Sequence, residues 1–304
     1  MQIISLPIPL ANYVTGTQGT VTLEVVLSRP ATTETSEATV LMLSFWGGSA
    51  STFKQLMLGF EESHNPRTYL AISYAGTGNT PAPLDDAAET HSIIPRANQL
   101  RVLLQQAEIK ELVTSRRLII CAHSMSAKIA YHFLAVLKDE GVQPTGLVLL
   151  GPAPVGPLVL PPEMQQQQLQ AYETEESATW TIENVLTARP GKLSPGDSAE
   201  LAKDCARMSP GAKHGWLKHG MAVDCSVVVT EMQKRWPRLA VRVLVGSDDK
   251  VETVERVQKG TVMPLQELGF DVEMAVVGGA GHLLPVEAPV AVQEAVSATV
   301  LDPR

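Results

Sequence analysis

The stretch from Leu118 to Leu137, LIICAHSMSAKIAYHFLAVL, constrains the fold of this chain more than any other segment. It begins with a short apolar run, residues 118–122, which is the pattern of a buried strand. Ser124 follows between small residues, and apolar side chains then recur at helical spacing up to Leu137. The pattern predicts a strand, a tight turn with a serine at its apex, and a helix.

Small residues flank this serine, with Ala122 two positions before it and Ser126 two positions after it. A turn that holds a serine at a strained backbone angle leaves little room between the strand and the helix that it joins, and small side chains fit there. The structural alternative is a buried strand that enters a helix with Ser124 as its N-cap.

The charge and length of the chain argue against several classes of partner. It has 304 residues and a formal net charge of −8, without a cluster of Lys or Arg, which disfavours nucleic acid or an anionic membrane. No apolar run approaches the ~20 residues that span a bilayer, and the N-terminus lacks the basic start of a signal peptide. We therefore expect a cytoplasmic protein, a monomer or a homodimer, that binds a small molecule.

The cysteines do not suggest a disulfide framework or a metal site. Cys121, Cys205 and Cys225 lie in apolar or helical surroundings and show no CxxC spacing. They are expected to be reduced thiols packed in the interior, and no metal is expected.

Apolar runs alternate with helical patterns along most of the chain, which predicts an α/β fold with a mostly parallel sheet. The first two predicted strands are joined by a polar linker, residues 31–38, that suits an exposed hairpin turn. A helix is predicted from Pro95 to Ala107. The predicted strands cover residues 21–27, 39–44, 68–76, 118–122, 146–150, 242–245 and 271–277.

The alternation stops between Val155 and Asp224, where no strand pattern is evident. Helices are expected after Pro161, near Glu176 and after Ser198, and the segment before Pro237 is expected to be a final helix. The predicted domains are therefore a core and a helical insertion. The core comprises residues 1–153 and 239–304, and the insertion comprises residues 154–238.

Two glycine-rich loops follow predicted strands. The first contains Trp46, Gly47 and Gly48, and a glycine turn between a strand and a helix is its structural alternative. The second contains Gly76 and Gly78, whose spacing fits neither a Walker loop nor a dinucleotide fingerprint, so these glycines are expected to be turn residues.

The last two predicted strands end in polar loops that could carry chemistry. Asp248 and Asp249 follow the strand at 242–245, although aspartates in a turn can also serve only to cap the next helix. His282 follows the final strand in a glycine loop, the only histidine of the chain in such a position.

Taken together, these motifs resemble the α/β-hydrolases. The small-x-Ser-x-small pattern around Ser124 is similar to the nucleophile elbow of that family, and the chain order Ser124, Asp249, His282 is the order of its triad. The sequence departs from the family where Trp46 replaces the usual histidine and where Ala122 and Ser126 replace glycines.

The resemblance implies an α/β-hydrolase core, a mostly parallel sheet flanked by helices, with a helical cap (lid) inserted after the sixth strand. It also implies roles for the site residues. Ser124 would be the nucleophile, His282 the base and Asp249 the acid, with Asp248 as the alternative acid. The backbone N–H groups of Gly48 and Met125 would form the oxyanion hole.

The implied activity is hydrolysis of a small or medium hydrophobic ester, thioester or lactone through an acyl-enzyme, without a cofactor. An acyltransferase or carbon–carbon hydrolase on the same triad, or a non-enzymatic receptor for a small ligand, are the alternatives. Large apolar residues are expected to line a pocket for a hydrophobic acyl substrate. They are Trp46, Met164, Trp180, Met208, Trp216 and Met221.

Overall fold

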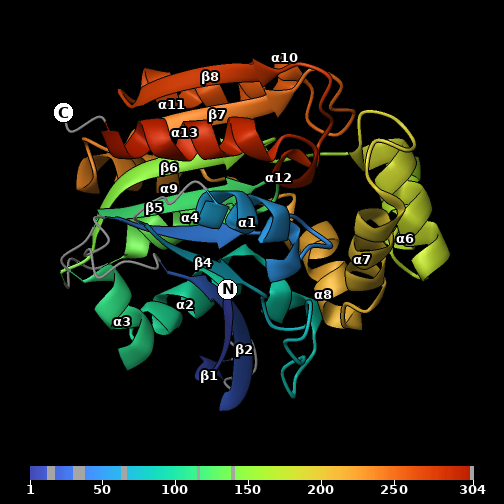
Figure 1. The fold of residues 1–304 in the computed structure, drawn as a ribbon, viewed down its shortest axis with the longest axis horizontal. Helices are drawn as coiled ribbons and strands as arrows, with labels where there is room; N and C mark the ends of the chain where they lie inside the picture. Colours follow the sequence, from blue (N-terminus) through green and yellow to red (C-terminus); the bar gives the residue numbers. More distant parts are fainter. Residues whose placement is uncertain (12–17, 30–37, 63–66, 115–116, 138–140, 302–304) are drawn as a thin grey trace.

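The computed structural model describes residues 1–11, 18–29, 38–62, 67–114, 117–137 and 141–301. Within them one sheet has the strand order β1-β2-β4-β3-β5-β6-β7-β8 (Figure 1). β1 and β2 pair antiparallel, β2 is antiparallel to β4, and the remaining neighbours are parallel. The strands are β1 Gln2–Ala11, β2 Gln18–Ser28, β3 Ala38–Leu43, β4 Thr68–Ile72, β5 Arg117–His123, β6 Gln143–Leu150, β7 Ala240–Gly246 and β8 Asp271–Val277.

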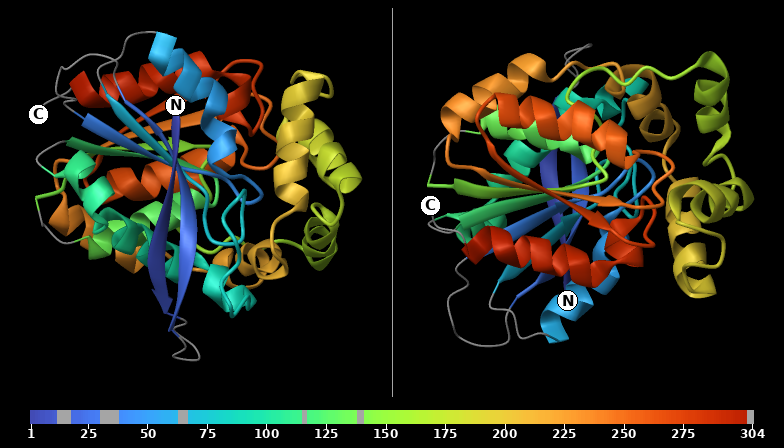
Figure 2. Two further views of the ribbon diagram at one scale, coloured as in Figure 1. Left: turned by 60° about the horizontal axis from the view of Figure 1, so that its bottom comes forward. Right: turned by 90° about the horizontal axis from the view of Figure 1, so that it is seen from above.

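Helices cover both faces of this sheet (Figure 2), which explains why its central strands are apolar on both sides. β3, β4 and β7 are buried at every position. One core cluster joins Leu41 and Ile120 to α2 and α4, and the other joins Val40 and Cys121 to α1 and α13. These helices are α1 Lys54–Glu62, α2 Ile93–Leu104, α4 Ser126–Val136 and α13 Pro289–Leu301.

Shorter helices complete the connections of the core. They are η1 Ala50–Phe53, η2 Ala88–His91, α3 Ala107–Val113, α10 Val254–Val257, η5 Gln258–Val262, α11 Met263–Glu267 and α12 Leu284–Glu287. The helix predicted from Pro95 to Ala107 is thus two helices, because α2 ends at Leu104 and α3 begins at Ala107.

The predicted hairpin between the first two strands is wrong. β2 pairs with β1 and β4, whereas β3 lies between β4 and β5 at the centre of the sheet. The physical reason is that β3 is buried throughout and needs a neighbour on each side. Most of the predicted hairpin turn, residues 30–37, lies outside the described residues.

β1 was not predicted from the sequence. Its prolines, Pro7 and Pro9, argue against a strand in general, but they are tolerated at the edge of a sheet, where β1 lies. Buried residues alternate with more exposed ones in both strands, so the pair turns one apolar face to the core; the buried residues are Leu6, Ile8, Val21, Leu23 and Val25.

Helices fill the chain between β6 and β7, as the sequence predicted. Those coloured yellow lie beside the carboxyl ends of the strands in Figures 1 and 2. Tyr172, Ile182, Leu201 and Cys205 of this helical segment form a small core that also includes Phe45. The segment comprises α5 Pro162–Gln170, α6 Glu175–Thr181, η3 Ile182–Leu186, α7 Pro195–Ala206, α8 Pro210–Gly215, η4 Trp216–Gly220 and α9 Ser226–Arg235.

The last of these helices, α9, packs on α4 of the core. The indole N–H of Trp236, directly after α9, donates to the carbonyl of Leu134 in α4 at 2.8 Å. The guanidinium of Arg235 donates to the carbonyl of Leu137 at 2.8 Å. α9 therefore covers the helix after Ser124 rather than the end of the sheet, and the domain boundaries given above stay a prediction.

A single side chain of α4 holds the chain after β6 next to the chain just before α9. The buried ammonium of Lys128 donates to the carbonyl of Gly156, where the chain leaves β6, and to that of Val223, where it returns to α9. The two connections between the core and the helices from α5 to η4 are thus both hydrogen-bonded to α4, the helix that follows Ser124.

Candidate active site

Ser124 lies in the sharp turn between β5 and α4, as the sequence predicted. Its φ of 56° is the only positive value of a non-glycine residue in the described part of the chain. Such a conformation costs ~1–3 kcal/mol and persists where the surroundings enforce it. Here the Ser124 N–H donates to the carbonyl of Leu150 at 2.8 Å, and its carbonyl accepts from the N–H of Ala153 at 3.1 Å.

Ser126 has a packing role that explains why it can replace a glycine in this turn. It is fully buried, and its hydroxyl donates to the carbonyl of Ser44 at the end of β3. The phenol of Tyr74 lies 3.3 Å from the same hydroxyl. Ser126 in place of glycine thus links the turn of Ser124 to the segments that follow β3 and β4, and it does not disrupt the turn.

Asp249 and His282 meet at the carboxyl ends of β7 and β8. The Asp249 Oδ2 lies 2.8 Å from His282 Nδ1, and the two residues are only 5% and 2% exposed. The second oxygen of Asp249 accepts the N–H groups of Val251 and Glu252 at 2.8 Å each, which orients the carboxylate. Asp248 is exposed and bonded to Ser247, so Asp249 is the aspartate that pairs with His282.

Gly151 lies between the turn of Ser124 and the Asp249–His282 pair. It follows Leu150, which accepts the Ser124 N–H, and a Cβ at this position would lie 3.0 Å from both Asp249 Oδ2 and His282 Nδ1. The imidazole of His123, next to Ser124, has its centroid 5.2 Å from that of His282. Ser124, Asp249 and His282 therefore share one edge of the sheet, around a glycine that the sequence analysis did not single out.

Burial and charge shift the pKa values of the two neighbouring histidines in opposite directions. Burial lowers the pKa of His282, but the Asp249 charge and hydrogen bond oppose it, and the net shift is upward. Burial, with the His282 charge, lowers the pKa of His123 to about 3. His123 is thus neutral, and its Nε2 lies 2.7 Å from the His282 carbonyl, where it can only donate. His282 is the histidine suited to exchange protons near neutral pH.

The predicted oxyanion-hole donors differ in availability. The Gly48 N–H donates to the carbonyl of Phe45 at 3.0 Å and closes the turn, so it is already used. The Met125 N–H makes no hydrogen bond within the described residues, and the same holds for Trp46 and Gly47. Met125 therefore fits the predicted role better than Gly48. In the turn after β3, the N–H groups without a hydrogen bond belong to Trp46 and Gly47, which precede Gly48.

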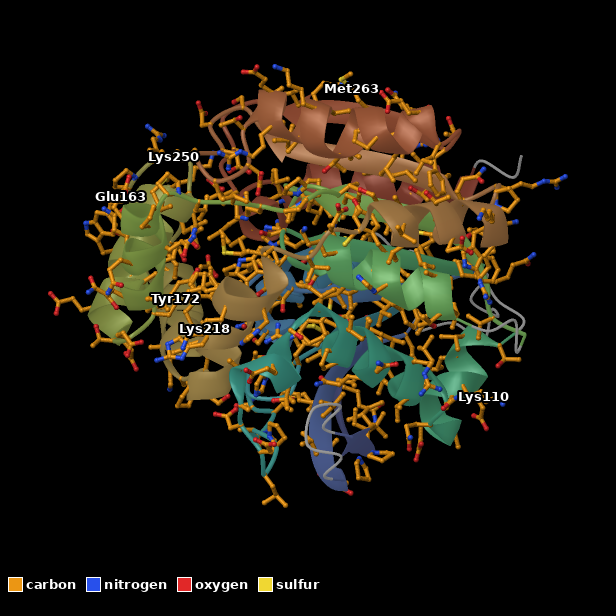
Figure 3. All side chains as sticks on the ribbon, turned by 180° about the vertical axis from the view of Figure 1, so that it is seen from behind. Lys110, Glu163, Tyr172, Lys218, Lys250 and Met263 are labelled. Atoms are coloured by element: carbon orange, nitrogen blue, oxygen red, sulfur yellow. The ribbon has the colours of Figure 1, made fainter. Side chains whose placement is uncertain are left out.

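The helical segment contacts the turn after β3, residues 46–48, through side chains. The ring of Tyr172, labelled in Figure 3, lies 4.5 Å from that of Trp46, whose indole donates to the carbonyl of Lys213 at 3.0 Å. A Cβ on Gly47 would meet Tyr172 at 2.8 Å, so only glycine fits beneath this ring. Asp204 of α7 accepts the hydroxyls of Ser49 and Ser51, directly after the turn.

The predicted pocket residues separate into two groups. Trp216 is 6% exposed, and Met208 and Met221 are buried, while Trp46 lies between the core and the helical segment. Trp180 and Met164 are 62% and 47% exposed, so the structure does not bring them to the site. The reason for Trp180 is helical phase, because α6 turns Ala178 inward and the residue two positions later outward.

The cysteines are free and buried, as predicted. Within the described residues, no group of three His, Cys, Asp or Glu side chains could hold a metal ion. None of the described helices is long and apolar enough to cross a membrane.

Comparison with known proteins identifies the family of the chain. A model of the alpha/beta hydrolase family matches residues 40–295, so the chain belongs to that family. Curated protein sequences gave no match.

Solved structures share the fold at low sequence identity. A bromoperoxidase from Bacillus anthracis has a TM-score of 0.76 and 13% identity, with 98% of this chain and 100% of that chain covered. An esterase from Exiguobacterium antarcticum has a TM-score of 0.70 and 15% identity, with 98% and 100% covered. A thermophilic esterase from Thermogutta terrifontis has a TM-score of 0.68 and 16% identity, with 99% and 98% covered.

Proposed function

We propose that this protein is a serine hydrolase that cleaves a small or medium hydrophobic ester, thioester or lactone through an acyl-enzyme at Ser124. The observation that carries the proposal is the buried Asp249–His282 hydrogen bond at the sheet edge where Ser124 has its positive φ. The names of similar structures, which include esterases from two organisms, support ester-type substrates.

The proposed mechanism follows from the roles of the three side chains. Asp249 accepts a hydrogen bond from the Nδ1–H of His282, which leaves Nε2 unprotonated and able to take the proton of the Ser124 hydroxyl. The serine oxygen then attacks the acyl carbon, and the leaving alcohol or thiol takes the proton back from His282. Water then gives a proton to His282 and attacks the acyl-enzyme, and His282 returns the proton to Ser124 as the acid leaves.

Negative charge on the carbonyl oxygen needs donors that are not already bonded. The Met125 N–H meets this condition, and we propose a second donor from Trp46 or Gly47 in place of Gly48. The proposed second donor lies one or two residues before the predicted Gly48 in the same turn.

The hydrophobic character of the substrate rests on the side chains around the core and helical segment. Trp46 and Trp216 are apolar surfaces at that boundary, and Met208 and Met221 can adapt to different acyl or aryl groups. An acyltransferase or carbon–carbon hydrolase would use the same triad and differ in what attacks or leaves. A receptor would use the same site without turnover.

Labelling with a fluorophosphonate probe, followed by peptide mass spectrometry, tests the proposal. Covalent modification is expected at Ser124 and is expected to vanish in Ser124→Ala. A panel of p-nitrophenyl esters, thioesters and lactones then gives the substrate class, and product esters formed on addition of an alcohol would identify acyl transfer. An unlabelled protein that binds esters without cleaving them would favour the receptor.

A further inference from the structure

One arginine beside the elbow lacks the partners that a buried charge requires. Arg96 of α2 is 1% exposed, and its guanidinium lies 4.8 Å above the ring of Tyr74. Its Nη1 lies 3.7 Å from the sulfur of Met125, the residue directly after Ser124. The guanidinium is therefore next to the residue whose N–H is the free candidate donor of the oxyanion hole.

The other edge of this guanidinium is unpaired. Nε and Nη2 of Arg96 have no hydrogen-bond partner within the described residues, and no acidic side chain there forms an ion pair with it. Burial lowers the pKa of Arg96 to about 10, which leaves the side chain charged at neutral pH. An uncompensated buried cation is costly, and buried charges are normally paired.

The charged groups nearest to Arg96 do not compensate it. His91 offers no negative charge, because a histidine is either neutral or cationic, and burial lowers its pKa. Asp86 is committed elsewhere, because its Oδ1 contacts His91 and Ser209 while its Oδ2 accepts the N–H of Gly211.

The geometry of the free edge indicates which ligand would fit. Nε–H and Nη2–H point in parallel from one side of the planar guanidinium, and this pair binds the two oxygens of a carboxylate simultaneously. We propose that Arg96 binds a single carboxylate group of the substrate, at the end remote from the scissile bond. The inference rests on the proposed ester hydrolysis and narrows its substrate class to monoanionic esters with an apolar body.

The distance between the two ends of such a substrate must be short. Met125 contacts Arg96 through its side chain and supplies the free N–H beside Ser124 through its backbone. Arg96 thus neighbours the turn that carries Ser124, and we expect short dicarboxylic half-esters, in which few bonds separate the carboxylate from the acyl carbon.

Matched substrates and variants test this proposal. The rates kcat/KM are measured for p-nitrophenyl hemiglutarate and for neutral p-nitrophenyl pentanoate, and their ratio is compared between wild type and Arg96→Met. Loss of one partner from a buried charged pair should lower this ratio about 100-fold. Arg96→Lys should give an intermediate ratio, because an ammonium keeps the charge without the two parallel donors.

The control is Arg101→Met on the same helix, which removes a charge that is not buried and should leave the ratio unchanged. A ratio that stays the same in Arg96→Met, or that falls equally in Arg101→Met, overturns the inference. If Arg96→Met does not fold, Arg96→Lys and Arg96→Gln carry the comparison.

A binding measurement separates this inference from the proposed function. Glutarate is titrated calorimetrically into Ser124→Ala and into Ser124→Ala combined with Arg96→Lys or Arg96→Met, and binding is expected only where Arg96 is intact. Glutarate binding without ester turnover would reject the proposed function and keep the carboxylate site. Ester turnover with no glutarate binding and an unchanged substrate ratio would reject the carboxylate site and keep the hydrolase.

Discussion

The sheet edge that carries Ser124 and the helical segment that lies beside it are held by different kinds of contact. Ser124 is fixed by backbone hydrogen bonds to Leu150 and Ala153, which depend little on the side chains of those residues. The helical segment is attached by side chains, with Asp204 accepting from two serine hydroxyls and Lys128 donating to two carbonyls, and also by backbone hydrogen bonds such as that from the Ser209 N–H to the Gly76 carbonyl. The position of Ser124 is therefore built into the backbone of the fold, whereas the attachment of the helical segment also depends on a few polar side chains.

His282 belongs to both regions. Its side chain pairs with Asp249 at the sheet edge, while its backbone N–H donates to the carbonyl of Leu186 in the helical segment at 2.7 Å. A disturbance of the segment can thus reach the base without touching the nucleophile. The contrast leads to the following predictions, in order of decreasing effect.

Ser124→Ala should abolish fluorophosphonate labelling and lower kcat by about 10⁶-fold, because triad members act as a unit. The fold should persist, since the backbone contacts of the turn do not use the hydroxyl. Circular dichroism and single-turnover kinetics measure both. Normal turnover in this variant would show that the nucleophile lies elsewhere.

Asp249→Asn should lower kcat about 10⁴-fold, because an amide no longer favours the His282 tautomer that accepts the serine proton. Asp248→Asn is the matched control, and its exposed carboxylate should matter less than threefold. Steady-state kinetics of both variants decide the assignment. Equal losses would mean that the His282–Asp249 bond does not orient the base.

Asp204→Ala should lower the free energy of unfolding by about 1–3 kcal/mol, because the hydroxyls of Ser49 and Ser51 lose their acceptor. Activity should fall about tenfold as the adjacent turn loses its fixed position. Denaturant unfolding and kcat/KM measure the two effects. The control is Glu200→Ala on the same helix, where an exposed ion pair with Lys54 contributes ~0–1 kcal/mol.

The pH profile of kcat/KM should show a single acidic limb. His282 must be neutral to act as a base, and its pKa is raised above the ordinary value of 6.5, so activity should begin to fall at a pH above 6.5. His123, with a pKa of about 3, adds no second limb near neutral pH. A midpoint below 6.5 would indicate that the Asp249 charge does not reach His282.

The parts of this protein that could be predicted from sequence are those with local signals. The apolar run before Ser124, the glycine after β3 and the polar loops after β7 and β8 each reveal a strand end, and in a parallel sheet those ends share one edge. From that rule the sequence predicts that Ser124, Asp249 and His282 lie at one edge of the sheet.

What could not be predicted depends on contacts between distant segments. The pairing of β2 with β4 follows from burial across the whole sheet, and the engagement of the Gly48 N–H depends on how its turn closes. Arg96 did leave a signal, because it stands four residues before Leu100 on the buried face of α2, where a charged residue is out of place. Its missing partner became evident only from the surroundings.

The two hydrogen bonds of Lys128 have a consequence for how the helical segment can vary. Because Gly156 and Val223 meet at one ammonium group, the chain between them leaves and re-enters the core at nearly the same point. A segment with such closely spaced ends can be exchanged for another of different length without displacing the scaffold beneath it. Replacing residues 157–222 by the corresponding segment of another family member is therefore a practical route to a new specificity, with the turn of Ser124 kept unchanged.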